Sequence, residues 1–250
     1  YSLQSRGLGD VYKRQTPAWS TSPSIAIWPA VTEPSSLTPR EDHPPTMSQP
    51  IERLTVQTDA AGLDAATAAL NAGLPIVLPT DTVYGLAVIA GDRAALERLF
   101  ELKDQPEDRS IAVLVSDIDK AEALGHFSEP ALAATHRYWP GALTLVVDRK
   151  AYISQTVGND DGTIGIRCPR HPFVRELARR VGPLSTTSAN LAGWPTPSEP
   201  LQAANALAGP VALLVDGGPG GRRASTVARI DDDGTVTIFR QGEVDLDAPS

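Results

Sequence analysis

Two cationic side chains flank a proline-containing turn of this sequence, Lys103 and Arg109 in the segment LKDQPEDRS (102–110). Lysine offers a point charge, and arginine offers a planar fork of donors that can contact two phosphate oxygens at once. A polyphosphate bound by the two residues is therefore one interpretation of the segment. The simpler interpretation is that Lys103 complements the negative C-terminal end of the helix before it. The residues alone favour neither.

Hydroxyl, amide and glycine residues gather in four further segments at the ends of apolar runs. Small residues let a ligand approach the backbone, and side chains such as Ser188 and Asn190 offer neutral hydrogen bonds. Taken alone, the first two segments below are better explained as surface turns, for example one in which Asp81 caps its own backbone. The segments are PTDTVYGLA (79–87), STTSANLAGWPTPS (185–198), DGGPGGRRASTV (216–227) and IFRQGEV (238–244), in which Arg240 ends a predicted strand.

Several common catalytic and cofactor motifs are missing from the sequence. It contains no GxxxxGK[ST] phosphate loop and no strand–GxGxxG–helix unit, so a nucleotide would have to be held in another way. The four histidines are scattered without metal-ligand spacing, and no Ser–His–Asp nucleophile is indicated. The only cysteine, Cys168, excludes a disulfide framework and a cysteine-rich zinc site. We therefore assign no metal ligands.

The elements that must position these segments alternate between helix and strand from residue 58 onward. Helices interleaved with apolar strands indicate an α/β fold, and the closing hairpin makes its sheet mixed. One domain of this length can bury a single core. We predict helices over 58–72, from 92, after 116, and over 130–138, 172–180 and 200–208. We predict strands over 75–79, 84–90, 111–116, 143–148, 163–167, 184–188 and 211–216, and a hairpin over 225–240.

Residues 1–46 do not fit this pattern. They hold seven prolines and many serines and threonines without helical or strand periodicity. Such a composition buries too little apolar surface to offset the entropy of ordering. The only methionine is Met47. We expect 1–46 to be a disordered or non-native N-terminal extension, with a cleaved targeting arm as the alternative, and 47–250 to form the one domain.

Composition and charge indicate the broad class of the protein. Hydrophobic residues make up 41% of the chain and charged residues 21%, which is ordinary for a globular protein. No apolar run approaches the ~20 residues of a membrane span, so we expect a cytoplasmic protein without a membrane partner. The net charge of −8 argues against tight non-specific binding of nucleic acid, although a local basic patch could still bind RNA weakly.

Taken together and in order, the segments resemble the YrdC-like family of L-threonylcarbamoyladenylate synthases. Single segments are weak, but several of them in register over nearly all of 51–243 are specific. The resemblance implies a single-domain, twisted and mixed α/β sheet around a deep, positively lined central cavity, in the short form of the family. It rests on PTDTVYGLA (79–87), WPGALTLVV (139–147), GTIGIRCPRHP (162–172), STTSANLAG (185–193), DGG…ST (216–226) and IFRQG (238–242).

The same resemblance implies roles for individual residues. Lys103 matches the phosphate-binding lysine of the family and forms, with Arg109, the predicted catalytic pair at the ATP phosphates. The other positions that match the nucleotide side are Thr163, Ser188, Asn190, Thr196 and Arg240. The positions that match the surroundings of the threonine substrate are Thr82, Arg167 and Ser225.

One departure from the family pattern follows Lys103. The family reads K-x-R-P at this point, whereas this chain has Gln105 before Pro106, and Ser110 stands where a proline is common. The neutral Gln105 removes a charge that would contact ATP, and Arg109 is the residue that could supply it instead.

The implied activity is a nucleotidyl transfer that begins the N6-threonylcarbamoyladenosine modification of tRNA. The amine of L-threonine captures bicarbonate as a carbamate. The carbamate then attacks the α-phosphorus of ATP, expels pyrophosphate and gives L-threonylcarbamoyl-AMP for a downstream tRNA threonylcarbamoyl transferase. Mg²⁺ would share the triphosphate charge and needs few protein ligands. No covalent enzyme intermediate is needed, which agrees with the lack of a catalytic triad in the sequence.

Two other functions compete with this interpretation. The first is a binding module for double-stranded RNA or tRNA that has no catalytic activity, which the net negative charge disfavours. The second is a carbamoyl-transfer enzyme of the hydrogenase-maturation type, which shares this domain. That enzyme would carry zinc-finger segments, and a chain with one cysteine does not provide them.

Overall fold

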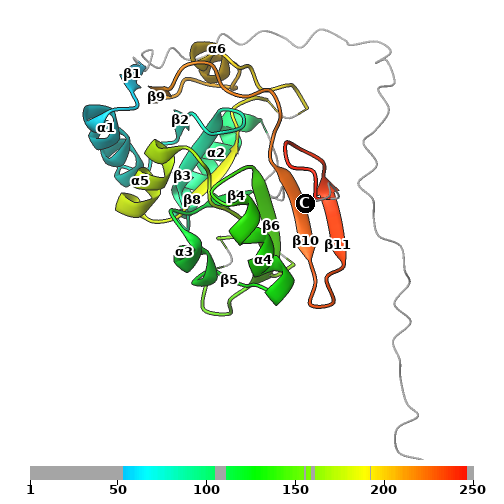
Figure 1. Cartoon of the computed structure of the whole chain (residues 1–250). Coiled ribbons are helices and arrows are strands. Elements are labelled where there is room, and N and C mark those ends of the chain that lie inside the picture. The colour runs from blue at the N-terminus through cyan, green and yellow to red at the C-terminus, as the bar shows by residue number, and fades with distance from the viewer. Residues whose placement is uncertain (1–52, 105–110, 155, 159–160, 192, 247–250) are drawn as a thin grey trace, which may run out of the picture. The chain divides into compact units, whose positions relative to one another are not determined.

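The computed structural model of the chain describes residues 53–104, 111–154, 156–158, 161–191 and 193–246 (Figure 1). The predicted extension 1–46 lies outside these residues, as do Gln105 and Arg109. What the sequence predicts for them therefore stays a prediction.

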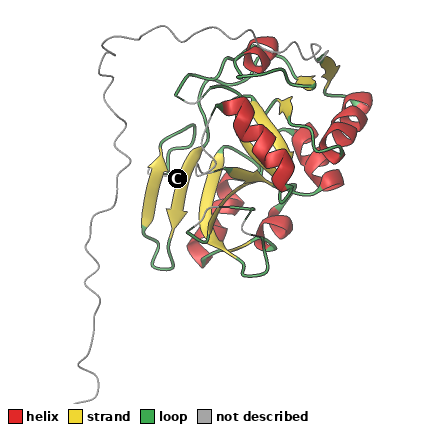
Figure 2. Ribbon diagram, turned by 180° about the vertical axis from the view of Figure 1, so that it is seen from behind, coloured by secondary structure: helices red, strands yellow, loops and turns green. Residues whose placement is uncertain are grey.

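Eleven strands and six helices lie in the described part of the chain (Figures 1 and 2). The strands are β1 (Leu54–Gln57), β2 (Ile76–Leu78), β3 (Gly85–Ile89), β4 (Ala112–Leu114), β5 (Gly125–His126), β6 (Leu143–Arg149), β7 (Thr163–Arg167), β8 (Leu184–Ser188), β9 (Leu213–Asp216), β10 (Thr226–Ile230) and β11 (Val236–Arg240). The helices are α1 (Ala60–Asn71), α2 (Arg93–Lys103), α3 (Ile118–Glu122), α4 (Glu129–Tyr138), α5 (Pro172–Val181) and α6 (Pro200–Asn205). The predicted α/β class is confirmed.

One sheet contains all of these strands, in the order β1-β9-β2-β3-β8-β4-β7-β6-β10-β11, with β5 paired to β6. The strands β1, β9 and β2 run parallel at one edge. Antiparallel pairs then join β2 to β3, β3 to β8 and β8 to β4. The sheet is mixed, as predicted, but already in its centre and not only at the closing hairpin β10–β11.

The side chains of β2 show how helices come to cover both faces of the sheet. Ile76 and Leu78 pack in a core with α1 and α5, whereas Val77 between them packs in a second core with α2 and α6. Successive side chains of a strand point to opposite faces, so this apolar run is buried from both sides. A third core joins β6 and β7 to α3 and α4.

Local capping fixes where the first two helices begin. Asp59 caps α1, because its side chain accepts a hydrogen bond from the Gly62 amide (2.8 Å). Gly73, just past the end of α1, has a positive φ of 69° that glycine tolerates best. Asp92 caps α2 in the same way as Asp59 caps α1. The eleven residues of α2 then end at Lys103.

The structure departs from the sequence prediction at three elements. Strand β1 was not predicted, because it contains no buried apolar run: none of its four residues is buried, and Leu54 is 54% exposed. The two-residue strand β5 is too short to show any periodicity. Helix α6 ends at Asn205, short of the predicted residue 208, and has no polar N-cap bond.

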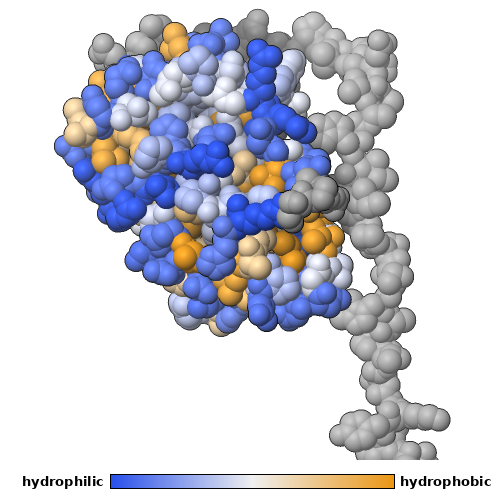
Figure 3. Space-filling model, in the orientation of Figure 1, coloured by the Kyte–Doolittle hydropathy of each residue, from blue (hydrophilic) through white to orange (hydrophobic). Residues whose placement is uncertain are grey.

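The surface of the described residues is hydrophilic over most of the face drawn in Figure 3, and apolar residues appear on it as separate patches. None of the described helices is both long and apolar enough to cross a membrane.

Candidate active site

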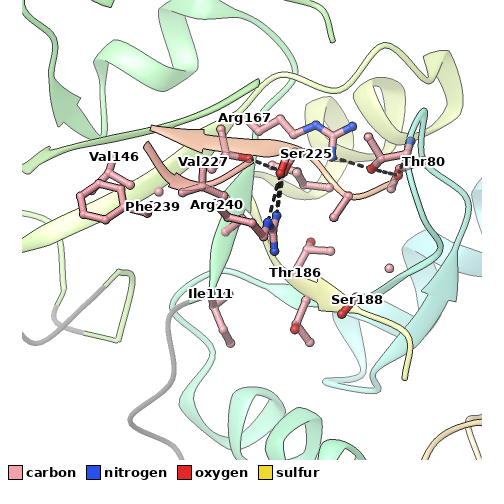
Figure 4. A pocket seen from close by; sticks show the side chains of 18 of the residues that line it. Thr80, Ile111, Val146, Arg167, Thr186, Ser188, Ser225, Val227, Phe239 and Arg240 are labelled. Carbon is pink, nitrogen blue, oxygen red and sulfur yellow. Dashed lines mark hydrogen bonds between the residues drawn. The ribbon is translucent and has the colours of Figure 1, made fainter. Parts of the chain in front are cut away.

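A cavity of about 470 Å³ lies over the centre of the sheet (Figure 4). Its floor includes a row of register neighbours from four adjacent strands, Thr186, Ala112, Gly165 and Val146. Paired residues of neighbouring strands present their side chains to the same face. Because Ala112 and Gly165 carry almost no side chain, the row leaves open space above the sheet where bulkier residues would fill it.

Arg167 lies at one end of this cavity and is only 5% exposed. Its guanidinium donates from Nε to the Gly141 carbonyl (2.9 Å), from Nη1 to Thr82 Oγ1 (2.9 Å) and from Nη2 to Asp81 Oδ1 (2.6 Å). Burial lowers the pKa of Arg167, and the carboxylate of Asp81 opposes that shift. Three contacts from three sides therefore hold a charged fork at the cavity wall, where a carboxylate of a ligand could meet it.

The glycine-rich segment 216–227 packs against the segment PTDTVYGLA (79–87). The buried Tyr84 hydroxyl donates to the Gly218 carbonyl (2.7 Å) and accepts from the Gly217 amide (3.1 Å). Burial raises the pKa of Tyr84, so its hydroxyl stays protonated. A Cβ atom at Gly221 would lie 2.4 Å from the carbonyl oxygen of Thr82, so a side chain does not fit there. Segments 79–87 and 216–227, weak when taken singly, together form one wall of the cavity.

Ser225, near the end of the segment 216–227, contacts Arg240 of β11 in the cavity wall. The Ser225 hydroxyl lies 2.8 Å from Thr144 Oγ1. Arg240 donates from Nε (3.1 Å) and Nη2 (3.0 Å) to the Ser225 carbonyl, and from Nη2 to the Ser225 hydroxyl (3.1 Å). Within the residues that the structure describes, no carboxylate forms an ion pair with Arg240. Its charge is therefore available to an anionic ligand.

Lys103 does not line the cavity but holds the loop beside it. Its ammonium, at the end of α2, is only 2% exposed. It donates to the carbonyls of Ser188 (2.7 Å) and Asn190 (2.5 Å) and to Asn190 Oδ1 (3.1 Å). Thr196 donates to the same Asn190 oxygen (3.3 Å). The Asn190 amide nitrogen donates in turn to the carbonyls of Leu191 and Trp194.

The structure thus divides the predicted site residues into two groups. Three of them, Lys103, Asn190 and Thr196, contact one another under the loop that follows β8. Arg109 lies outside the described residues. The six that line the cavity are Thr82, Thr163, Arg167, Ser188, Ser225 and Arg240.

Several residues that the sequence did not single out also line the cavity: Thr80, Tyr84, Asp161, Arg229 and Phe239. Thr80 and Tyr84 belong to the PTDTVYGLA segment and could have been found through it. Asp161 and Arg229 belong to no predicted site segment. The Asp161 carboxylate accepts from the amide (2.9 Å) and hydroxyl (2.6 Å) of Thr163, and the bond from that hydroxyl is the main reason why the pKa of Asp161 is lowered.

The charge of the cavity wall is positive although the chain as a whole is negative. Arg167, Arg229 and Arg240 line the cavity, with Asp161 as the only carboxylate in the described lining. Arg229 is balanced by Asp148 (2.9 Å) and by Asp231 (2.8 Å), and Arg167 by Asp81 (2.6 Å). Among the described residues, Arg240 is therefore the lining arginine whose charge no carboxylate balances. No group of three or more His, Cys, Asp or Glu residues that could hold a metal ion occurs among the described residues.

The fold and the cavity define an α/β protein with a pocket that cationic and hydroxyl side chains line. The Sua5/YciO/YrdC family model, described as "Telomere recombination", matches residues 68–242. The chain therefore belongs to the Sua5/YciO/YrdC family. This finding confirms the family predicted from the sequence segments.

Three similar proteins give the family its chemical context. A Bacillus subtilis protein named threonylcarbamoyl-AMP synthase is 37% identical over 193 residues, which cover 76% of this chain and 56% of the relative. A Mycobacterium tuberculosis protein that carries the same name provisionally is 35% identical over 184 residues, 73% of this chain and 85% of the relative. The crystal structure of Pyrococcus abyssi Sua5 in complex with L-threonine has a TM-score of 0.69 and 28% identity, and covers 76% of this chain and 57% of that one. The matched part of the chain thus covers little more than half the length of two of these three proteins. The curated names confirm the predicted enzyme class.

Proposed function

We propose that this chain forms L-threonylcarbamoyl-AMP from ATP, L-threonine and bicarbonate with release of pyrophosphate. The observation that carries the proposal is that one cavity holds residues from both predicted substrate sides. Thr82, Arg167 and Ser225 represent the threonine side, and Thr163, Ser188 and Arg240 the nucleotide side. A reaction that joins two substrates needs both in one cavity, with their reacting atoms held in place.

The reaction as proposed needs no nucleophile from the protein. The threonine nitrogen attacks the carbon of bicarbonate, and loss of water leaves a carbamate. A carbamate oxygen then attacks the α-phosphorus, and the bond from that phosphorus to the pyrophosphate oxygen breaks. Negative charge builds up on the phosphate oxygens, and the guanidinium of Arg240 in the cavity wall would stabilise it. The chain contributes position and charge rather than a covalent intermediate.

Arg167 is the residue we assign to the threonine carboxylate. Its guanidinium is already fixed by Asp81, Thr82 and Gly141, so little entropy is lost when the substrate binds. Its placement supports the role that the sequence segments predicted for it.

Lys103 and Arg109 remain the predicted phosphate-binding pair. The contacts of Lys103 support a second, indirect part for it, because it binds the carbonyl of Ser188, the cavity-lining residue at the end of β8. Mg²⁺ fits the donor set only as an ion held chiefly by phosphate oxygens and water. Asp161 is the only described carboxylate in the lining and could be its one acidic ligand. A bound Mg²⁺ would share the triphosphate charge.

The product of this reaction is an activated acyl phosphate that a tRNA threonylcarbamoyl transferase would consume in the cytoplasm. That setting follows from the sequence prediction and from the tRNA modification to which the activity belongs. The alternative, an RNA-binding module without catalysis, would bind RNA in a salt-dependent manner and would not turn over ATP.

The test is product analysis of the full chain with ATP, L-threonine and ¹³C-bicarbonate. We expect threonylcarbamoyl-AMP with one ¹³C atom, detected by mass spectrometry, and one pyrophosphate per product. Parallel reactions without threonine or without bicarbonate are the controls, and both should give no AMP conjugate. AMP formation that does not depend on threonine would contradict the proposal, and so would RNA binding without any product.

A further inference from the structure

The strand β11 carries an extra residue beside the cavity. Along the hairpin, Ile230 pairs with Val236 and Ala228 with Ile238, but Val227 pairs with Arg240. Phe239 is therefore the residue that the pairing passes over. An extra residue of this kind is a β-bulge, which turns side chains in directions that a regular strand does not allow and is common beside active sites.

The bulge has a direct effect on the cavity wall. In a regular strand, two consecutive side chains point to opposite faces of the sheet. Here the consecutive residues Phe239 and Arg240 both line the cavity, together with Val227, the pairing partner of Arg240. The irregular register thus places an aromatic ring and a guanidinium side by side in the same wall.

The surroundings of the Phe239 ring are apolar. Val146 and Val227 line the cavity with it, and Figure 4 shows the ring beside Val146, at the end of the cavity away from Thr80. Phe239 is 59% exposed, although large apolar residues are usually covered. An exposed aromatic ring beside two valines offers a flat apolar surface that a planar group can cover.

We propose that Phe239 is the platform on which the adenine of ATP stacks, with Arg240 placed by the same bulge to meet the phosphates. Aromatic side chains bind nucleobases by stacking, and the adjacent cation suits a nucleoside phosphate. The inference rests on the proposed function for the identity of the nucleotide, and it adds the binding residue for the base. Stacking does not distinguish bases, because every base has a π-face, so Phe239 provides affinity rather than base selection.

The test is calorimetric binding of AMP and of inorganic pyrophosphate to the full chain. Loss of one stacked base typically weakens binding by about 5-fold to 150-fold. Phe239→Ala should therefore weaken AMP and GMP by a similar factor in this range and leave pyrophosphate unchanged, and Phe239→Trp should restore AMP binding. Val236→Ala is the matched control, because Val236 is an exposed apolar residue of the same strand (42%) that does not line the cavity.

The outcomes separate this inference from the proposed function. Unchanged AMP affinity in Phe239→Ala overturns the platform, even if the wild-type chain makes threonylcarbamoyl-AMP. Equal losses of AMP and pyrophosphate affinity also overturn it, because they indicate a general disturbance of the wall. A chain that makes no threonylcarbamoyl-AMP, but loses AMP affinity only in Phe239→Ala, keeps the platform and loses the proposed function.

Discussion

Arg167 is a buried cation whose geometry depends on its planar fork. Lysine carries the same charge but only one nitrogen, which cannot reach Asp81, Thr82 and Gly141 from three sides at once. We expect Arg167→Lys to lower kcat/KM for threonine by about 10- to 100-fold, since each lost bond to a charged group is worth ~1.5–3 kcal/mol. Steady-state kinetics with varied threonine measure this effect.

The control for this substitution is Arg170→Lys. Arg170 is exposed, three residues further along the same segment, and does not line the cavity. Arg170→Lys should keep kcat/KM within about twofold, since substitutions of surface residues outside the core and the site change little. Equal kinetics for Arg167→Lys and the control would contradict the role of Arg167 at the threonine carboxylate.

Lys103 shows how structure changes a prediction made from sequence. A lysine that only complements the helix dipole would contribute about 0.3–1 kcal/mol. Lys103 instead satisfies two carbonyls and one side-chain oxygen in a buried loop. We expect Lys103→Met to lower the free energy of unfolding by about 2–4 kcal/mol, because buried acceptors lose their donor, and to reduce turnover strongly. Urea unfolding measures the stability change.

The exposed Lys120 of α3 provides the comparison for Lys103. Lys120→Met should change the free energy of unfolding by no more than about 0.5 kcal/mol. If Lys103→Met is as stable as Lys120→Met yet inactive, the loop contacts are unimportant and the phosphate role stands alone. If both variants are stable and active, neither role holds.

Residue types and their order predicted much of the site, but not how its members meet. The resemblance identified six site residues that do line the cavity, because the motif segments lie at the ends of strands. It could not show that Lys103 faces Asn190, since that contact joins residues 87 positions apart. Nor could it find Arg229, which lies in no motif segment. Phe239 lies within the IFRQG segment, but its place in the cavity wall depends on a bulge that only the strand pairing shows.

At the scale of elements, α5 presents a histidine at its positive end. His171 stands at the N-cap without a side-chain cap bond, and no partner of its Nδ1 atom occurs among the described residues. Burial lowers the pKa of His171, and Asp81 opposes this. A positive charge at a helix N-terminus is also unfavourable. The folded protein therefore favours the neutral imidazole.

This lowered pKa predicts how stability depends on pH. Below the unfolded pKa of ~6.5, the unfolded chain binds a proton at His171 that the folded chain resists, so the stability present above this pH is lost as pH falls toward the folded pKa. His171→Gln removes the effect. We expect the unfolding free energy of the wild type to fall relative to His171→Gln between pH 7.5 and 5.5. His126→Gln, at an exposed position, is the control. Parallel profiles for wild type and His171→Gln would contradict the prediction.

Helices and strands could be predicted where their burial requires an apolar sequence pattern. Strand β2 is a continuous apolar run that is buried throughout, and β6 is buried over its first three residues. Strand β1 was missed because it lies at a sheet edge and pairs only with β9, so nothing forces its side chains to be apolar. The order of the strands in the sheet could not be predicted either, since it depends on which strands, far apart in the sequence, pair with one another.

For the molecule as a whole, residues 1–46 are predicted to be dispensable. Their composition is rich in proline, serine and threonine, which disfavours a packed core. A chain that begins at Met47 should melt within about 1 °C of the full chain and form product at the same rate, since surface changes of this kind cost little. A melting temperature lower by several degrees would show that the extension stabilises the domain.

Substrates should stabilise the whole molecule, because the cavity is built from distant segments of the chain. A ligand that binds only the folded state adds about 2.7 kcal/mol at 100 times its dissociation constant. For a domain of this size that shifts the melting temperature by about 5–11 °C. We expect L-threonine and a non-hydrolysable ATP analogue each to raise the melting temperature in calorimetry. Arg167→Lys should lose most of the threonine shift and keep the nucleotide shift. Loss of both shifts in that variant would contradict the separate threonine and nucleotide sides of the cavity, since the two ligands would then depend on the same residue.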